Sequence, residues 1–418
     1  MSTNFKKFNK CKLCNSINLV EVLNLADLPI GDKYMPEEKA DLAKEAYELK
    51  IMMCQNCNHY QNSGYVDPDL IYGFYLSRPA TTNPDLAEAF KEYADYIVKN
   101  FSNKKQNLFA VEAGSNNGIF IQYMKEKLNT KVLGVEPSNL YKHALKNEVD
   151  TINDYFNSNV AKTILNDYGQ SDFLIANHTF SNVIDNIDFL KGVKTLLKDD
   201  GVFCMQTFYQ KTVVEKNLLE NFTHEHLSYF YVKPLKSFFE RNGMELFDVK
   251  FVPAKAGSIR CFVQKKNGPH KVLQSVKEFI DDEIKFGMDD FNRHETVKLF
   301  INETKDKIHD FISPLMKDGK KIAAYGTSTG ATTFSFNYEL GKSLSFFVDD
   351  DEFRHGLLSP FYNIPVVSSK KIKEEKPGAI IILAPLYADN IIKKNKDYLS
   401  DGGKFIKFWP KFEVVSNT

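Results

Sequence analysis

Short apolar runs recur through the middle of this chain, between segments in which apolar residues are spaced three and four positions apart. Between residues 106 and 265 these runs have the length of single β-strands. They are Leu108–Val111, Val132–Val135, Phe173–Ala176, Gly201–Gln206, Leu246–Phe251 and Ile259–Val263. Strands that alternate with helical segments form βαβ units, so this region is predicted to fold as an α/β domain around a parallel sheet.

Helical periodicity flanks this region on both sides. Residues 80–105 carry an apolar stripe at helical spacing, made of Leu86, Phe90, Tyr93, Ile97 and Phe101. Residues 268–318 are rich in charge and are predicted to form a connecting helical segment.

The alternation restarts near the C-terminus. Lys321–Tyr325, Ser343–Val348 and Ala379–Ala384 are predicted strands, and helical segments follow the first and the last. Because this series is far from the first along the chain, we expect it to form a separate α/β domain over residues 319–418.

Four of the six cysteines form two pairs, Cys11 with Cys14 and Cys54 with Cys57. A Cys-x2-Cys turn places two thiolates on one side of a tight loop, and two such turns complete a tetrahedral zinc site. Four thiolates leave no open coordination position, so we expect this zinc to stabilise the fold. His59 is an alternative ligand.

The other two cysteines, Cys204 and Cys261, lie inside strand-like runs and are expected to be small buried hydrophobic residues.

Composition narrows the class of protein. The 54 basic and 54 acidic residues cancel, so no basic field favours nucleic acid. No apolar run approaches the roughly 20 residues of a membrane span, and residues 1–10 contain no signal-peptide core. We therefore expect a cytoplasmic protein with no membrane or nucleic-acid partner. The oligomeric state stays open, a monomer included.

A glycine-containing loop, EAGSNNG at residues 112–118, follows the first strand of the central region and precedes a helical segment. Glu136, at the end of the second strand, is suited to accept both ribose hydroxyls of an adenosine. The loop lacks the GxGxxG spacing of a dinucleotide site. S-adenosylmethionine, which has no phosphate, suits it better; a dinucleotide site and a structural turn are the alternatives.

Four segments carry a resemblance to a known family. Residues 112–118, 134–137 (GVEP), 175–177 (IAN) and 224–230 (HEHLSYF) resemble the sugar C-methyltransferases of deoxysugar pathways. The similarity extends along almost the whole chain, and the two cysteine pairs belong to it.

The resemblance implies a fold and a cofactor. We expect a zinc-binding module (1–75), a class I S-adenosylmethionine-dependent methyltransferase domain (76–267), a connecting helical segment (268–318) and a C-terminal Rossmann-like domain (319–418) that helps to hold a nucleotide-linked sugar. The residues expected to bind the cofactor are Glu112, Gly114, Asn116, Gly118, Glu136, Pro137 and Asn177.

Methylating carbon requires a base that removes a proton next to a ketone, and groups that stabilise the resulting enolate. The resemblance places Glu225 and His226 in the active site, and His224 is adjacent to them. Tyr72 and Tyr75 match a tyrosine-containing active-site stretch of the family, although aromatic residues at this spacing also serve packing.

Three positions depart from the family pattern. Thr223 stands where a tyrosine is common, Asn182 where a histidine is usual, and the loop at residues 325–331 lacks the usual lysine. His178 is the histidine nearest to Asn182. A threonine is a poor general base, so the base is predicted to be His226, His224 or a tyrosine from elsewhere.

Two segments are candidates for binding the nucleotide-linked sugar. Gly326, Thr327 and Ser328 follow a strand and can cradle a phosphate through backbone N–H groups. Lys255 and Arg260 can add positive charge for a diphosphate. An ordinary strand–helix turn and a solvated strand end are the alternative interpretations.

Three functions compete. The first is C-methylation of a nucleotide-linked keto-sugar through an enolate. The second is O- or N-methylation on the same scaffold, which the missing tyrosine and histidine motivate. The third is a sugar-nucleotide binding protein without turnover. The sequence names neither the nucleotide, the sugar nor the methylated carbon.

Overall fold

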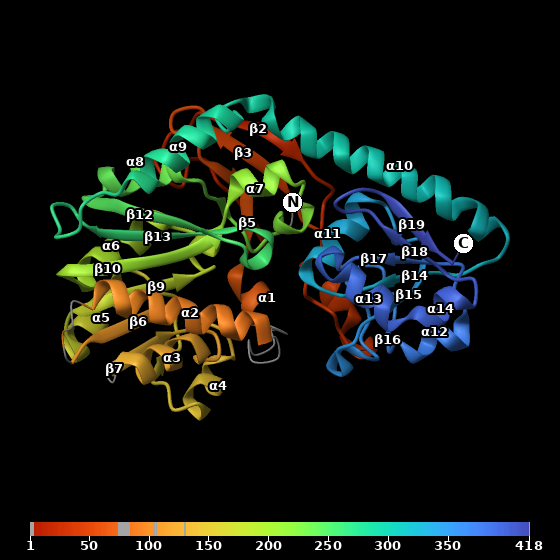
Figure 1. The fold of residues 1–418 in the computed structure, drawn as a ribbon, viewed down its shortest axis with the longest axis horizontal. Helices are drawn as coiled ribbons and strands as arrows, with labels where there is room; N and C mark the ends of the chain where they lie inside the picture. Colours follow the sequence, from red (N-terminus) through yellow and green to blue (C-terminus); the bar gives the residue numbers. More distant parts are fainter. Residues whose placement is uncertain (1–3, 74–83, 103–104, 106, 129–130, 418) are drawn as a thin grey trace.

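The computed structural model describes residues 4–73, 84–102, 105, 107–128 and 131–417, so Tyr75 lies outside the described residues. Its strands form two large sheets, one on each side of the molecule, and a smaller N-terminal sheet (Figure 1). Among the described residues, no helix is both long and apolar enough to cross a lipid bilayer.

The central sheet has seven strands in the order β12-β13-β10-β9-β6-β7-β8. They are β6 (Phe109–Ala113), β7 (Lys131–Val135), β8 (Thr151–Ile152), β9 (Ser171–Asn177), β10 (Leu197–Phe208), β12 (Met244–Val252) and β13 (Ser258–Lys265). This order, with β13 reversed against both neighbours, is that of a class I methyltransferase domain. Strand β13 therefore departs from the parallel sheet that the strand–helix alternation predicted. Only residues 253–257 join β12 to β13, which is too short for a crossover between parallel strands.

Helices cover both faces of the central sheet, which explains why its strands are continuous apolar runs. They are α2 (Pro84–Phe101), α3 (Ile119–Leu128), α4 (Tyr141–Lys146), α5 (Ser158–Tyr168), α6 (Asn186–Leu196) and α8 (Val232–Arg241). Phe173 and Cys204 belong to the cluster formed with α2 and α3, whereas Leu174 and Cys261 belong to the cluster on the opposite face. Both cysteines are fully buried, as predicted.

The N-terminal sheet has the order β11-β4-β3-β2. It contains β2 (Leu19–Asn24), β3 (Lys50–Cys54), β4 (Tyr60–Asn62) and β11 (Ser228–Tyr229), while β1 (Phe5–Lys7) pairs with β5 (Gly64–Val66). The short strand β11 comes from the middle of the chain, and its Tyr229 pairs with Tyr60. The segment that carries Glu225 and His226 is therefore anchored directly to the N-terminal sheet.

The C-terminal sheet has the order β16-β15-β14-β17-β18-β19, and only β19 is antiparallel to its neighbour. Its strands are β14 (Ile322–Tyr325), β15 (Leu344–Val348), β16 (Val366–Val367), β17 (Ala379–Ile382), β18 (Lys404–Lys407) and β19 (Glu413–Ser416). The helices of this half are α11 (Thr329–Asn337), α12 (Lys370–Glu375), α13 (Ala388–Lys394) and α14 (Lys396–Ser400). The two strand series thus build two separate sheets, as the sequence predicted.

Two long helices connect the central domain to the C-terminal half. Helices α9 (Gln274–Phe286) and α10 (Glu295–Lys317) occupy the predicted connecting segment, and α10 runs across the molecule toward the C-terminal sheet (Figure 1). The shorter ones are α1 (Pro68–Tyr72), α7 (Gln210–Glu215), η1 (Glu37–Ala43), η3 (Phe180–Asn182), η4 (Leu219–Asn221), η5 (Ala254–Ala256), η6 (Phe291–His294), η7 (Glu352–Arg354) and η8 (Pro385–Tyr387).

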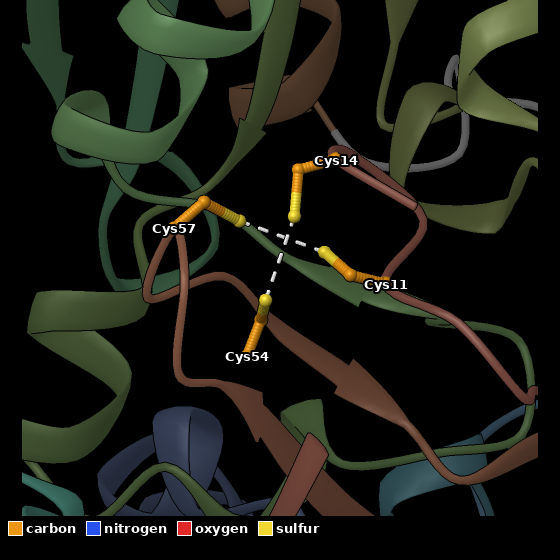
Figure 2. Close-up of side chains that lie close together, drawn as sticks. All are labelled: Cys11, Cys14, Cys54 and Cys57. Atoms are coloured by element: carbon orange, nitrogen blue, oxygen red, sulfur yellow. Dashed lines mark hydrogen bonds between the residues drawn. The ribbon is translucent and has the colours of Figure 1, made fainter. Parts of the chain in front are cut away.

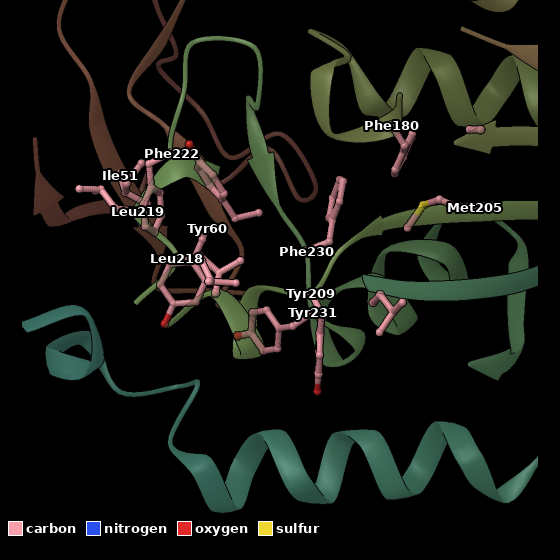
Figure 3. Packing of buried hydrophobic residues seen from close by; sticks show 14 of the residues in the cluster. Ile51, Tyr60, Phe180, Met205, Tyr209, Leu218, Leu219, Phe222, Phe230 and Tyr231 are labelled. Atoms are coloured by element: carbon pink, nitrogen blue, oxygen red, sulfur yellow. The ribbon is translucent and has the colours of Figure 1, made fainter. Parts of the chain in front are cut away.

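One apolar core joins the N-terminal sheet to the central domain. Ile51 and Tyr60 of the N-terminal sheet belong to the same cluster as Phe222, Phe230 and Met205 (Figure 3). A buried aromatic side chain contributes a large apolar area, so this shared core resists separation of the two parts.

Candidate active site and metal centre

The four paired cysteines converge on one point (Figure 2). Their sulfur atoms all lie within 4.8 Å of one another, and the Sγ atoms of Cys11 and Cys57, like those of Cys14 and Cys54, are 3.5 Å apart. Zn–S bonds of about 2.3 Å in a tetrahedron place sulfur atoms about 3.8 Å apart. The cluster therefore fits a four-thiolate Zn²⁺ site.

The two cysteine turns have the same backbone geometry. Asn15 and Asn58 each stand four residues after the first cysteine of a pair, and both have positive φ, 60° and 62°. The N–H of Asn15 donates to the carbonyl of Cys11, and the N–H of Asn58 donates to that of Cys54. Asparagine tolerates this left-handed conformation better than most residues, so each turn closes without a glycine.

His59 is not a fifth member of the cluster. Its ring stacks on Phe230 with centroids 5.4 Å apart, and its Nε2 lies 3.3 Å from the hydroxyl of Ser228. The histidine is completely buried and packs the module against β11. The alternative in which His59 binds the metal is therefore not supported by the geometry.

A cavity of about 480 Å³ opens where β6, β7 and β9 end, which is the edge at which open α/β sheets bind ligands. Most of the predicted cofactor residues line this cavity, namely Glu112, Gly114, Asn116, Glu136, Pro137 and Asn177. Gly118 is outside it. A Cβ atom there would lie 3.1 Å from Ala144 and Val149, so Gly118 allows close packing at the start of α3.

The loop after β6 is fixed by the acid at the end of β7. Glu136 accepts hydrogen bonds from the backbone N–H of Asn116 (2.7 Å) and of Ser138 (2.9 Å). Gly114 has φ +73°, and a Cβ atom there would approach the hydroxyl of Thr179 to 2.3 Å. A side chain at residue 114 would thus clash with the next wall of the cavity.

Glu112 and Asn177 form a buried polar pair beside this loop. Asn177 Nδ2 donates to Glu112 Oε1 over 2.9 Å. Neither Glu112 Oε2 nor Asn177 Oδ1 has a hydrogen-bond partner in the part of the chain that is described. Burial raises the pKa of Glu112 to about 8. A ligand with an ammonium group, as in the methionine part of S-adenosylmethionine, would favour the ionised form of Glu112 and would give Glu112 Oε2 and Asn177 Oδ1 a donor.

The catalytic candidates gather at another part of the same cavity. Glu225 and His226, together with His178 and Lys255, line it. The rings of His178 and His226 lie 4.7 and 4.8 Å from the ring of Phe208, and Lys255 Nζ lies 5.4 Å from it. The cavity therefore joins a predicted cofactor region to a group of side chains that can move protons and stabilise negative charge.

The hydrogen bonds of His226 define its tautomer. Its Nδ1 lies 2.7 Å from the carbonyl oxygen of Asn221, which can only accept, so Nδ1 carries the proton and Nε2 keeps its lone pair. Burial lowers the pKa of His226 to about 4. The ring is therefore neutral at pH 7 and has one basic nitrogen.

His178 is held through its other ring nitrogen, Nε2, and no role was assigned to this histidine from the sequence. The side-chain oxygen of Gln206 accepts from Arg260 Nε (2.7 Å), so its amide group donates to His178 Nε2 over 3.1 Å. The proton of a neutral His178 then sits on Nδ1, which is buried without a partner among the described residues. His178 also has φ 56°, a strained value for this residue type.

Tyr72 lies on the cavity wall, where its hydroxyl accepts a hydrogen bond of 3.2 Å from Asn182. Burial raises the pKa of Tyr72, which keeps the hydroxyl protonated. His224 points elsewhere: it is buried outside the cavity lining, with Nε2 3.3 Å from the carbonyl oxygen of Tyr47. The base predicted at His224 is thus corrected to a residue that packs the N-terminal module.

Two predicted substrate contacts are also absent from the cavity. Arg260 is 4 % exposed, and its guanidinium lies over the ring of Tyr93 and donates to Gln206. In the C-terminal loop, the backbone N–H and the hydroxyl of Thr327 both donate to Asp349. A carboxylate at this position repels a phosphate, so the geometry does not support the phosphate cradle predicted at Gly326, Thr327 and Ser328.

Profiles of three protein families match successive parts of the chain. A zinc binding domain matches residues 11–72, a methyltransferase domain residues 86–249, and a C-methyltransferase C-terminal domain residues 253–410. Together they describe the same order of parts that the resemblance implied.

Two individual proteins are similar to the chain in sequence. C-methyltransferase NovU of Streptomyces niveus is 25 % identical over 413 residues, which is 98 % of each chain. A tRNA U34 carboxymethyltransferase of Aliarcobacter butzleri is 22 % identical over 276 residues, covering 63 % of this chain and 82 % of that one.

Solved structures with some likeness include an S-adenosylmethionine-dependent methyltransferase from Clostridium acetobutylicum. It has a TM-score of 0.37 and 15 % identity, and the match covers 45 % of this chain and 98 % of that one. The plantazolicin methyltransferase BpumL in complex with SAH has a TM-score of 0.32 and 11 % identity over 45 % of this chain and 93 % of that one.

Proposed function

We propose that this chain, which belongs to the zinc-containing S-adenosylmethionine-dependent C-methyltransferases, methylates a carbon next to the ketone of a nucleotide-linked keto-sugar. The observation that carries the proposal is a single cavity with Glu112 and Glu136 in one part and Glu225 and His226 in another. The sugar acceptor is supported by the resemblance of residues 224–230 to the sugar C-methyltransferases.

When bound, S-adenosylmethionine supplies an electrophilic methyl group on a sulfonium and leaves as the neutral thioether. Glu136, at the end of β7, is proposed to accept the ribose hydroxyls, and Glu112 with Asn177 to accept the ammonium group. Gly114 and Asn116 let the backbone of the loop approach the ligand closely.

His226 is the proposed general base. Its Nε2 takes the proton from the carbon next to the ketone, and the electron pair of that C–H bond forms the enolate. The enolate carbon then bonds to the methyl group, and the ketone is regenerated. The imidazolium formed on His226 is stabilised by its Nδ1–H bond to the carbonyl oxygen of Asn221, and Glu225 lines the same cavity.

Lys255 is the proposed electrostatic stabiliser of the enolate oxygen. It is the lysine among the cavity-lining residues, and Glu225 is near enough to interact with its charge. Lys255 and Ala256 have positive φ, 52° and 65°, and Gly257 follows with φ 141°. Such strain persists only where the surrounding structure imposes it, and it concentrates at functional sites.

Isothermal titration of the protein with S-adenosylhomocysteine and with a panel of nucleoside diphosphates tests this proposal. Binding of the cofactor product and of one nucleotide supports a nucleotide-linked acceptor and selects the base. Cofactor binding without any nucleotide binding would instead point to another class of carbon acceptor in the same cavity.

A further inference from the structure

A lysine of the zinc cluster reaches the wall of the catalytic cavity. Lys12 stands between the ligands Cys11 and Cys14, and its side chain is buried, 6 % exposed. Its Nζ lies 2.6 Å from the carbonyl oxygen of Val183 and 2.6 Å from that of Ile184. These residues are more than 170 positions away in the sequence, so the contact joins two parts of the chain.

Val183 and Ile184 themselves line the cavity. They belong to the loop at residues 178–185, between β9 and α6, which also carries His178 and Asn182. Lys12 contacts main-chain oxygens of this loop, so it holds the backbone of Val183 and Ile184 independently of their side chains. An ammonium group between two carbonyls makes charge-assisted hydrogen bonds, which are stronger than neutral ones.

The backbone of Lys12 lies between the clustered cysteines Cys11 and Cys14 and is also held by Gln61. Its backbone N–H donates to Gln61 Oε1 over 2.8 Å, and Gln61 Nε2 donates to the carbonyl of Lys10 over 3.2 Å. Gln61 lies on β4 and pairs with Ser228 of β11. The turn that holds two of the four thiolates is thus the rigid base from which the Lys12 side chain extends.

We propose that Lys12 is a positioning residue that couples zinc binding to the shape of the loop at residues 178–185. Zinc orders the cysteine turn, the turn orients Lys12, and Lys12 holds the main chain of Val183 and Ile184 against the cavity. This proposal rests on the proposed function in one respect: the loop at residues 178–185 is taken to lie beside the bound acceptor.

The test compares Lys12→Met with Arg241→Met. Methionine matches the length of lysine without the ammonium group. Arg241 is the matched control, because its NH2 contacts the carbonyl of Leu13 in the same turn (3.5 Å) but it does not line the cavity. Three quantities are measured on the full chain: zinc content, affinity for S-adenosylhomocysteine, and hydrogen–deuterium exchange of the amides of residues 182–189.

For Lys12→Met we expect full zinc content, an S-adenosylhomocysteine affinity within about twofold of wild type, and roughly tenfold faster exchange over residues 182–189. Arg241→Met should leave that exchange unchanged, and Lys12→Arg should restore most of the protection. Unchanged exchange in zinc-loaded Lys12→Met, or an equal increase in Arg241→Met, would overturn the inference. None of these three measurements needs the acceptor substrate, so a failure of the Lys12 proposal can be told apart from a failure of the proposed function.

If Lys12→Met does not retain zinc, the wild-type protein supplies the test. Stepwise withdrawal of zinc with EDTA should deprotect residues 182–189 in step with the metal lost, while α3 keeps its protection. Full protection of residues 182–189 in metal-free protein would exclude the coupling.

Discussion

The Nδ1 atom of His226 lies 2.7 Å from the main-chain carbonyl oxygen of Asn221. This contact fixes the tautomer of the ring through the backbone, so no side-chain substitution at residue 221 removes it. The nitrogen that remains free, Nε2, is the one that can take a proton from a substrate. His226 therefore has a nitrogen with a lone pair, which is what the proposed mechanism requires of its base.

The acid limb of the pH–rate profile follows from this arrangement. Burial lowers the pKa of His226 to about 4, and only the neutral ring can act as a base. Above that pKa the ring is neutral, so kcat/KM for the acceptor, measured with saturating S-adenosylmethionine, should stay level from pH 7 to about 5 and fall as the pH drops through about 4. A limb centred near 6.5, the ordinary value of histidine, would show that His226 is solvated in the working enzyme. The profile of kcat/KM against pH, corrected for folded fraction, checks this.

The affinity for the cofactor product should depend on pH through Glu112. Burial raises its pKa to about 8, and a bound ammonium group favours the ionised carboxylate. Below pH 8 binding must therefore release a proton, and affinity should rise as pH increases from 6 to 8. Titration calorimetry in buffers of different ionisation enthalpy measures this release. Glu112→Gln should bind more weakly and without proton release; release that persists in this variant would assign it to another group.

Replacement of Glu136 by alanine should weaken binding of S-adenosylhomocysteine. The carboxylate supports the loop through Asn116 and is proposed to accept the ribose hydroxyls. Loss of hydrogen bonds to a charged group costs about 2 kcal/mol or more, which corresponds to roughly a 30-fold rise in Kd. Calorimetry with the purified variant measures the Kd. Wild-type affinity would show that the acid at the end of β7 has been misassigned.

Lys255→Met should lower kcat by about tenfold or more while leaving the Kd for S-adenosylhomocysteine near the wild-type value. The reason is that Lys255 is proposed to stabilise charge that develops only during the reaction. Lys250→Met is the control, because Lys250 lies on β12 and does not line the cavity. Its Nζ is 4.1 Å from the centre of the Tyr96 ring on α2. Equal losses in both variants would indicate a general effect of lost charge.

Cys54→Ser should release zinc and destabilise more than the N-terminal module. The core that contains Ile51 and Tyr60 continues to Phe222 and Phe230 (Figure 3), so disorder in the module exposes apolar surface of the central domain. Thermal unfolding should begin at a lower temperature than in wild type, together with loss of metal measured by mass spectrometry. A metal-free variant with an unchanged Tm would contradict a structural zinc site.

The sequence was informative where the signal is local. Each predicted strand of the central region overlaps an observed one, because continuous apolar runs mark strands that are covered on both faces. The zinc cluster was predictable because a Cys-x2-Cys turn sets its own geometry. Glu112 and Glu136 were singled out because they stand at the ends of two predicted strands, and both line the cavity, Glu112 from the end of β6 and Glu136 directly after β7.

Features that depend on distant contacts could not be predicted. Strands β8 and β16 have two residues each, too few to leave a pattern. His224 and His226 are two positions apart, yet one contacts the carbonyl of Tyr47 and the other lines the cavity, and both environments are built by residues distant in sequence that no local pattern reveals. Arg260 was predicted to meet a diphosphate, but Gln206 and Tyr93 enclose it.

The most direct test of the central claim is the fate of a labelled methyl group. S-adenosylmethionine with a ¹³C-methyl group is incubated with the enzyme and nucleoside diphosphate keto-deoxyhexoses, and the product is examined by NMR. We expect the labelled methyl group on a carbon next to the ketone, and its loss in His226→Ala. A label on oxygen or nitrogen, or undiminished carbon methylation by His226→Ala, would contradict it.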